Sequence, residues 1–535
     1  MGSHAPGAAA AAAVGSHAPG AATAAAMGSH APGAAAAAHA ALADFAHPVS
    51  VEEFRRLGYE TVDMVCDYMA AARSAKVLPD VAPGYLRALL PPSAPEQAEP
   101  FAAVKADFLS KIMPGVTHWQ SPRFFAWFGG NTSAPSQIAD MLCGALNMIG
   151  FSWQSSPAST ELEMVMMDWL AKLCGLPEKF LSPTARGDSG GGNSDAPPRP
   201  ASGGVIQSTS SEAVLVAMLA ARARTMQGRP AEDALRLVCY GSDQAHSCYQ
   251  KAAMVAGVAH VRKLPTSGEH AHAVQADALD AAIERDVADG LLPFYACGTI
   301  GTTSSCAVDP VGELGRVCAR HGVWLHVDAA WAGSASILPE QRHWFEGLDQ
   351  ADSYSFSVHK WLVTGFDCAA MWLSDTTHLL AALSLTPAYL VGVGNVHDFK
   401  CWQIPLGRRF RSLKLWFVLR MYGQAKLQAL LRHHIALGEW FAQRVAADAR
   451  LELAAPPRFG LTCFRLAGAG DAANRALLER INADGSVFLV GTDLGGRFTL
   501  RFAVGCAHTQ LEHVEQGWAA VAAAVADVLA SQAGE

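Results

Sequence analysis

The chain has 535 residues, a length that predicts two or three domains rather than a single core. Hydrophobic residues make up 51% of it, charged residues make up 16%, and the formal net charge is −8. A mildly acidic chain with no Lys/Arg cluster beside aromatic residues is not expected to bind nucleic acid, which requires a basic face. No uninterrupted apolar run is long enough to span a bilayer, so we expect no membrane contact.

The 12 cysteines are scattered along the chain, and no two of them are spaced as a CxxC pair. We therefore expect neither a metal site nor a short disulfide framework. Most of the cysteines lie in apolar segments, which is typical of small buried side chains in a reducing compartment. Because a secretory signal with a basic start and an apolar core is also missing, the sequence predicts a cytoplasmic protein.

The first residues form a tandem repeat in which Gly-Ser-His-Ala-Pro-Gly occurs at 2–7, 15–20 and 28–33. Ala, Gly and Pro dominate this segment, so little apolar area can be buried to offset the entropy of ordering it. The sequence predicts a disordered tail over residues 1–43. An organellar transit peptide is the alternative, but such peptides are rich in Arg and this tail has none.

Folded sequence is expected from residue 44 onward. Residues 44–133 are predicted to be an N-terminal helical segment, because a helical pattern begins at Val51 and continues to about Arg73. Residues 134–412 are predicted to form a large domain, with a flexible Gly- and Pro-rich insertion at 182–204. Residues 413–535 are predicted to form a smaller C-terminal domain.

Short strands alternate with helices in the large domain. The strands are expected at Val205–Gln207, Leu235–Tyr240, Leu292–Cys297, Val323–Asp328 and Ser353–Ser357, with helices between them that include Glu212–Arg224 and Gly312–His321. This alternation predicts an α/β domain with a mainly parallel sheet. In the C-terminal domain, helices at Leu413–Leu437 and Thr509–Ala530 enclose strand-like segments at Leu461–Leu466 and Arg497–Phe502, which indicates an α+β arrangement.

Four polar motifs follow these strands, at the position where ligands collect in open α/β sheets. The first motif places Ser210 and Ser211 at the start of a helix. Backbone N–H groups, hydroxyls and the helix dipole favour an anion such as phosphate at that position. The alternative is an ordinary serine that caps the helix.

The second and third motifs contain an acid and a lysine. Asp328 ends an apolar strand, where a buried carboxylate needs a partner such as a protonated pyridine nitrogen; the alternative is an Asp that caps the next turn. Lys360 follows the strand that ends at Ser357, and a buried lysine has a lowered pKa and can attack a carbonyl to form a Schiff base. Taken alone, His359-Lys360 would be an ordinary surface pair.

The fourth motif, Asp243 to Ser247, contains His246. Its imidazole can stack on a flat ring or act as an acid or base, and the alternative is a structural histidine. A phosphate cradle, a partner for a pyridine nitrogen, a reactive lysine and a stacking ring together fit one cofactor, pyridoxal 5'-phosphate.

These motifs closely resemble the group II pyridoxal-phosphate-dependent decarboxylases, in particular aromatic L-amino acid decarboxylases of the tryptophan and tyrosine decarboxylase type. The resemblance covers nearly everything between Ala46 and Ala530. Its most specific stretches are residues 204–207, 242–247, 326–330, 359–361 and 405–414. It implies the fold type I architecture, with a mainly parallel seven-stranded sheet in the large domain, and a homodimer whose active sites lie at the subunit interface.

The resemblance also implies a role for each matching residue. Lys360 would be the Schiff-base lysine, Asp328 the partner of the pyridine nitrogen, and His246 the ring that stacks on the cofactor. Further cofactor contacts would come from Ser210, Ser211, Thr303, Ser357 and His359. The substrate pocket would be formed by Trp119, Phe128, Gly130, Phe151 and Gly407, some of them supplied by the partner subunit.

Tyr389 matches the loop tyrosine that returns a proton to the substrate Cα in this family. Its loop, residues 385–397, is rich in glycine, as expected of a segment that closes over a site. Relatives that are aldehyde synthases carry Phe at this position, so Tyr389 and His246 together predict decarboxylation to an amine. An aldehyde synthase is one alternative, and a catalytically silent binding relative is the other, which the intact Lys360 and Asp328 argue against.

Two departures from the family pattern concern the site. Ser357 stands where the family usually has Asn, so its shorter hydroxyl would reach the phosphate directly or through a water. Gly129 and Gly130 replace a Pro and a Thr or Ala, which leaves a roomier wall and favours a bulky side chain such as indole. Gly407 indicates the same preference, because Gly accompanies indolic substrates among plant relatives. Tryptophan or 5-hydroxytryptophan is therefore the predicted substrate, with tyrosine or DOPA next.

Overall fold

The computed structural model describes residues 49–187, 201–385 and 398–533. The predicted tail, the middle of the predicted insertion and Tyr389 lie outside these ranges. The chain divides into two units, of which the first contributes residues 49–63 and 95–100 to the described part. Helix α2 (Val51–Ala71) begins in this first unit, as the helical pattern predicted.

The second unit is built around a seven-stranded sheet with strand order β1-β7-β6-β5-β4-β2-β3. The strands are β1 (Gly203–Gln207), β2 (Leu237–Ser242), β3 (His260–Leu264), β4 (Leu292–Thr299), β5 (Trp324–Asp328), β6 (Ser353–Phe356) and β7 (Ala369–Leu373). Neighbouring strands are parallel except around β7, which runs antiparallel to both β1 and β6. The prediction of a mainly parallel sheet is confirmed.

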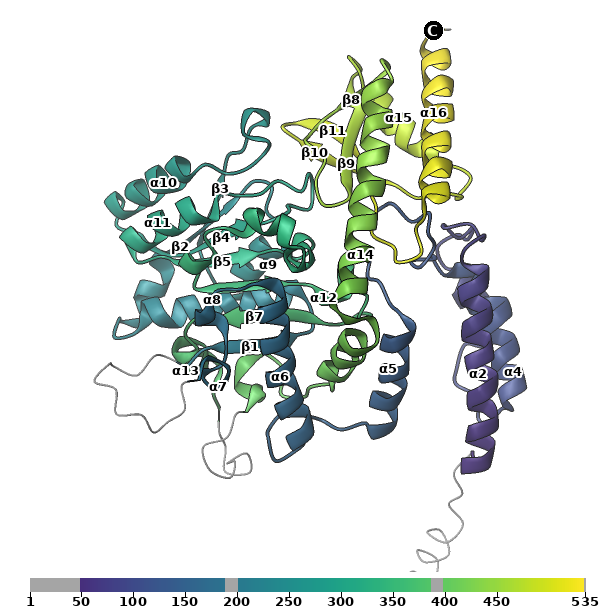
Figure 1. The fold of residues 1–535 in the computed structure, drawn as a ribbon, viewed down its shortest axis with the longest axis horizontal. Helices are drawn as coiled ribbons and strands as arrows, with labels where there is room; N and C mark the ends of the chain where they lie inside the picture. Colours follow the sequence, from purple (N-terminus) through teal and green to yellow (C-terminus); the bar gives the residue numbers. More distant parts are fainter. Residues whose placement is uncertain (1–48, 188–200, 386–397, 534–535) are drawn as a thin grey trace, which may run out of the picture. The chain divides into compact units, whose positions relative to one another are not determined.

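Helices cover both faces of this sheet (Figure 1). On one face, α8 (Ser210–Met226), α9 (Cys248–Val255) and α13 (Thr377–Leu383) share a buried apolar core with the sheet. On the other face, α6 (Pro157–Cys174), α10 (Ala276–Ala288) and α11 (Val311–His321) form a second core. Successive strand residues point alternately into the two cores. Both faces of the central strands are therefore buried, and the sequences of these strands are continuous apolar runs.

The C-terminal part contains an antiparallel sheet with strand order β10-β11-β9-β8. Its elements are α14 (Arg411–Ala447), β8 (Leu451–Leu453), β9 (Leu461–Leu466), α15 (Asp471–Asn482), β10 (Val490–Leu494), β11 (Arg497–Ala503) and α16 (Leu511–Ala533). Helix α14 runs from the large sheet to this smaller one (Figure 1). It breaks at Gly423, whose φ of 67° favours a residue without a Cβ.

Shorter helices complete the second unit. They are α3 (Tyr85–Leu89), α4 (Phe101–Asp107), α5 (Ala134–Leu146), α7 (Pro183–Arg186) and α12 (Val358–Trp361). Helix α7 lies at the start of the predicted insertion, and β1 begins near the end of that insertion. Among the described residues, no helix has both the length and the apolarity needed to cross a membrane.

Candidate active site

The four motifs lie at one edge of the large sheet. Strands β1, β2, β4, β5 and β6 all point the same way, so their carboxyl ends meet at that edge. Ser208 follows β1, Asp243 follows β2, Asp328 ends β5 and Ser357 follows β6. The sheet therefore brings together motifs that are up to about 150 positions apart in the sequence.

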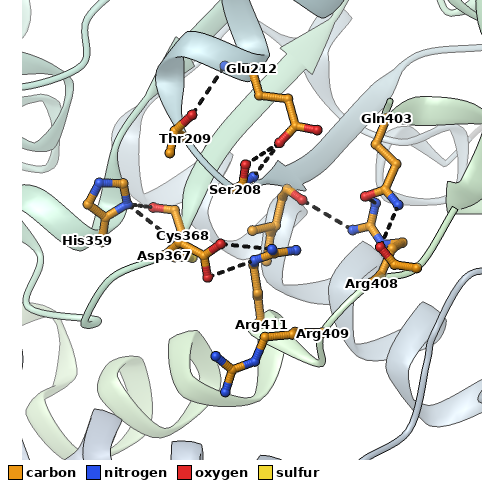
Figure 2. Close-up of polar contacts among 12 residues, drawn as sticks. Ser208, Thr209, Glu212, His359, Asp367, Cys368, Gln403, Arg408, Arg409 and Arg411 are labelled. Atoms are coloured by element: carbon orange, nitrogen blue, oxygen red, sulfur yellow. Dashed lines mark hydrogen bonds and ion pairs between the residues drawn. The ribbon is translucent and has the colours of Figure 1, made fainter. Parts of the chain in front are cut away.

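At the start of helix α8, the hydroxyls of Ser210 and Ser211 are not used to cap the helix. Thr209 caps the helix through its Oγ1, which accepts a hydrogen bond from the Glu212 amide at 3.3 Å. The Glu212 carboxylate in turn accepts hydrogen bonds from the amide and hydroxyl of Ser208 (Figure 2). Because Thr209 already caps the helix, neither Ser210 nor Ser211 is needed as the cap.

Ser210 follows β1 and Ser357 follows β6, two strands that β7 separates in the sheet, and the two serines meet in the structure. Their hydroxyl oxygens lie 2.7 Å apart, and both side chains are buried. Ser357 is the residue that departs from the family pattern, and its hydroxyl now faces the start of α8. Two hydroxyls beside the amide groups of a 17-residue helix form a donor set that suits a phosphate group.

Asp328 is buried, and one of its carboxylate oxygens accepts the Ala330 amide at 2.9 Å. Within the described part of the chain, no hydrogen bond reaches the other oxygen. Burial raises the pKa of Asp328, while the charge of Lys360, the Ala330 amide and His246 oppose that shift. A carboxylate in this setting calls for a further cationic donor, as a pyridine N–H would provide.

Lys360 lies in the short helix α12 and is half-buried. Burial lowers the pKa of its ammonium, Asp328 opposes this shift, and Arg501 adds to it. A lowered pKa increases the fraction of neutral amine, which is the form that attacks a carbonyl.

His246 is exposed in the isolated chain. Its Nδ1 accepts a hydrogen bond from the Cys248 amide at 3.2 Å, which places the proton of the neutral ring on Nε2. Removal from water by the surrounding protein lowers the pKa of His246, and the charge of Lys360 lowers it further while Asp328 raises it. The neutral ring is thus free to stack on a flat ligand.

His359 and Thr303, the two other predicted cofactor contacts, lie in different settings. The Nδ1 atom of His359 is 2.7 Å from the Cys368 carbonyl oxygen and 3.0 Å from its amide nitrogen (Figure 2). Burial lowers the pKa of His359 to about 4, so the ring is neutral at pH 7. Thr303 follows the end of β4 and is partly exposed, whereas its neighbour Thr302 is buried and accepts the Ala307 amide at 3.0 Å.

Asn131 binds the backbone of the predicted Schiff-base lysine, a contact that the sequence did not reveal. Its side-chain amide donates to the carbonyls of Lys360 and Gly505, each at 2.7 Å. Its side-chain oxygen accepts the Ala507 amide at 3.2 Å, and its backbone amide donates to the His359 carbonyl at 2.8 Å. Asn131 therefore links the backbone around Lys360 to the loop that follows β11.

Aromatic rings stack in a column beside the lysine. Phe128 stacks on Trp331 at 4.4 Å, Trp331 on Trp361 at 4.5 Å, and Trp361 on His434 at 6.4 Å between ring centroids. The Arg501 guanidinium lies over Phe128 at 4.9 Å. Burial lowers the pKa of Arg501, and its Nε and Nη2 atoms find no hydrogen-bond partner among the described residues. This cation was also not anticipated from the sequence.

The five predicted substrate residues fall into two groups. Phe128 is buried in the column, Trp119 stacks on Phe124 at 4.9 Å, and a Cβ on Gly130 would lie 4.0 Å from the His359 carbonyl. The second group is Phe151 and Gly407, which lie on two loops joined by backbone hydrogen bonds. No hydrogen bond or ring contact between described residues joins the two groups.

A lysine of lowered pKa beside a buried aspartate, with a phosphate-type cradle and a neutral histidine, is the arrangement expected of an α/β protein that carries a cofactor on a reactive lysine. Among the described residues, no cluster of His, Cys, Asp or Glu is arranged to hold a metal ion. The donor set fits pyridoxal phosphate: Ser210 and Ser357 would suit its phosphate, Asp328 its ring nitrogen and Lys360 its aldehyde.

Comparison with known proteins gives the family. The model of the pyridoxal-dependent decarboxylase conserved domain matches residues 83–467, and the chain belongs to that family. Aromatic-L-amino-acid decarboxylase of Bos taurus is 48% identical, covering 91% of this chain and 99% of its own length. Phenylacetaldehyde synthase of Arabidopsis thaliana is 44% identical, covering 88% and 95%. The crystal structure of Oryza sativa TDC with PLP and tryptamine superposes with a TM-score of 0.85 at 40% identity, covering 90% and 99%.

Proposed function

We propose that this protein is a pyridoxal-phosphate-dependent decarboxylase that converts aromatic L-amino acids to the aromatic amine and CO₂. The observation that carries the proposal is the convergence of Lys360, Asp328, His246 and the Ser210–Ser357 pair at one sheet edge. Relatives at 44% identity or more over most of the chain act on aromatic amino acids or yield an aromatic aldehyde, as their names state.

The cofactor contacts are assigned from the chemistry of the donors. Ser210, Ser211 and Ser357 would hold the phosphate at the start of α8, and His246 would stack on the ring. Asp328 would accept the pyridine N–H, and Lys360 would anchor the aldehyde. Thr303 and His359 would provide further contacts. When bound, the cofactor withdraws the electron pair that the departing CO₂ leaves behind.

The chain's own residues would move protons during the reaction and would hold Lys360 in position. Lys360 can exchange a proton because burial brings its pKa down, and Asp328 stays ionised when a cation faces it. Asn131 fixes the backbone from which Lys360 projects. Tyr389 is proposed as the acid that returns a proton to the substrate Cα; this assignment rests on the sequence, because Tyr389 lies outside the described residues.

An aromatic acetaldehyde synthase on the same scaffold is the second candidate, favoured by the 44% identity to phenylacetaldehyde synthase. Purified holoenzyme given one aromatic amino acid should release the amine in equal amount to CO₂. Aldehyde, ammonia and hydrogen peroxide in place of the amine would instead establish the synthase. If added cofactor gives neither visible absorbance nor product, the protein is a silent binding relative.

Tryptophan or 5-hydroxytryptophan is the proposed preferred substrate, ahead of tyrosine and DOPA. Gly130 and Gly407 have backbone angles open to any residue, and an added Cβ would meet only ordinary contacts, at 3.9 Å and 3.5 Å. A glycine at these two positions therefore leaves space for the substrate and is not required by the backbone conformation. Offering tryptophan, 5-hydroxytryptophan, tyrosine, DOPA and phenylalanine together should yield mainly indolic amine, and mainly phenolic amine would overturn this preference.

A homodimer with active sites at the subunit interface is proposed from the two separate substrate groups. Helix α5 and the loop after it also expose large apolar side chains, which a partner subunit would cover. These are Ile138, Met141, Leu142, Leu146 and Ile149.

The dimer proposal can be tested by complementation. Subunits carrying Lys360→Ala and subunits carrying Gly407→Trp should each be inactive as homodimers. If Gly407 serves the partner's lysine, a random mixture should regain about a quarter of the wild-type activity, because half of the dimers hold one intact site. A mixture that stays inactive would place both residues in the same subunit's site.

A cytoplasmic location is proposed from the cysteines. All 12 are unpaired, and 11 of them are buried, which suits a reducing compartment. Fractionation of the source cells should recover the activity with cytosolic markers, and recovery with an organelle would overturn this proposal.

A further inference from the structure

The segment of residues 402–408, here termed the wall turn, carries Gly407 and is attached at both ends to strand β1. Gln207 donates from its side-chain amide to the Trp402 carbonyl at 2.7 Å. Arg408 donates from Nη2 to the Ile206 carbonyl at 3.2 Å. Because β1 leads directly into the start of α8, the wall turn is fixed to the strand that presents the phosphate cradle.

A buried ion pair strengthens the second attachment. The Arg408 guanidinium pairs with the Glu163 carboxylate of α6, and the same carboxylate oxygen accepts the Ile206 amide at 2.8 Å. Both charged side chains are only 2% exposed. The Phe399 ring lies 4.8 Å from the guanidinium carbon. Since breaking such a pair would leave a buried charge without a partner, Arg408 has one well-defined position.

Gln403 connects this fixed arginine to the turn itself. Its side-chain oxygen accepts Arg408 Nη1 at 2.9 Å (Figure 2). Its Nε2 atom lies 2.5 Å from the Pro405 carbonyl oxygen, 3.4 Å from that of Leu406 and 3.3 Å from that of Gly407. Gln403 is buried. The Gln403 side-chain amide thus contacts three successive carbonyl oxygens, and these contacts set the curvature of the wall turn.

The curvature decides how far Gly407 lies from the loop that carries Phe151. The Gly150 amide donates to the Arg408 carbonyl at 3.1 Å, which joins the two loops at one point. Beside that point, a Cβ on Gly407 would lie 3.5 Å from Ile149 Cγ2. A change in the turn would therefore widen or narrow the gap between Gly407 and Ile149.

We propose that Gln403 is a positioning residue that determines substrate specificity by fixing the wall turn. It does not touch the substrate in this proposal; it acts through Gly407. The proposal rests on the proposed function, because it requires that the wall turn lines a pocket for an aromatic side chain.

The test compares Gln403→Leu and Gln403→Glu with the wild-type holoenzyme, using tryptophan and DOPA separately. Leu removes all the contacts of the amide, whereas Glu keeps an acceptor for Arg408 and removes the donor to the three carbonyls. Both variants should change the ratio of kcat/KM for the two substrates by about fivefold or more, through KM rather than kcat. The visible absorbance of the bound cofactor should not change.

Gln428→Leu is the matched control, because Gln428 also donates from its side chain to a backbone carbonyl, that of Ile337, at 2.7 Å. Its substrate ratio should stay at the wild-type value. Gly407→Ala combined with Gln403→Leu should give a non-additive change if both act through one turn.

A ratio that stays within about twofold of wild type in both Gln403 variants, or strictly additive effects with Gly407→Ala, would overturn the inference. Failure of the proposed function has a different signature, since the wild-type enzyme itself would then form no amine from either substrate.

Discussion

Replacing Asn131 with Ala should destabilise the protein and should also lower the activity that depends on the position of Lys360. The side chain is 2% exposed and bonds four backbone groups: the carbonyls of Lys360 and Gly505 at 2.7 Å each, that of Gly129 at 3.3 Å, and the Ala507 amide at 3.2 Å. Because its amide nitrogen has only two N–H groups for the three carbonyls, these contacts amount to three hydrogen bonds. A buried hydrogen bond contributes about 1 kcal/mol net, so the free energy of unfolding should fall by about 3 kcal/mol. Because one of these bonds holds the Lys360 carbonyl, kcat per folded molecule should also fall.

Asn474→Ala provides the comparison. Asn474 is fully buried and makes two hydrogen bonds of 2.9 Å, to the Leu466 amide and to the Gly470 carbonyl, in the C-terminal part of the chain. Its replacement should cost about 2 kcal/mol and leave kcat of the folded enzyme unchanged. Urea denaturation followed by circular dichroism gives the first quantity, and amine release at a temperature where both variants are folded gives the second.

Two results would refute this reasoning. A loss of less than about 1 kcal/mol for Asn131→Ala would mean that its hydrogen bonds are exchanged for others at little cost. An equal loss of kcat in the Asn474→Ala variant would mean that general destabilisation, and not the position of Lys360, governs activity.

Three further predictions follow from the same structure. Lys360→Ala should abolish turnover while circular dichroism shows an unchanged fold, and normal turnover would exclude Lys360 as the anchor. Tyr389→Phe should shift product from amine toward aldehyde, and an unchanged amine yield would point to another acid. Burial lowers the pKa of His434 to about 3, so folding keeps it neutral; stability should fall as pH falls from about 6.5 toward 3. His434→Gln should flatten that dependence in urea titrations, and an unflattened curve would assign it to other groups.

Much of the fold could be predicted from the sequence because its helices and strands follow local patterns of apolar and polar residues. The strand at Leu461–Leu466 was predicted with its exact bounds, and α11 began one residue earlier than expected. Strand β3 was missed because His260–Leu264 carries three polar residues at the edge of the sheet. Strand β7 was missed because Ala369–Leu373 follows the lysine motif closely, with no helix between them to mark a new strand.

The sequence by itself predicted the chemistry of the proposed site: Lys360, Asp328, His246 and the serines are residue types whose order after successive strands indicates a pyridoxal-phosphate site. Only the tertiary structure decided how they are held. Asn131 meets the Lys360 carbonyl across 229 positions of sequence, and Glu163 meets Arg408 across 245. A motif reflects local backbone geometry, whereas such contacts depend on how whole elements pack, and no local pattern encodes which distant carbonyl a buried amide will find.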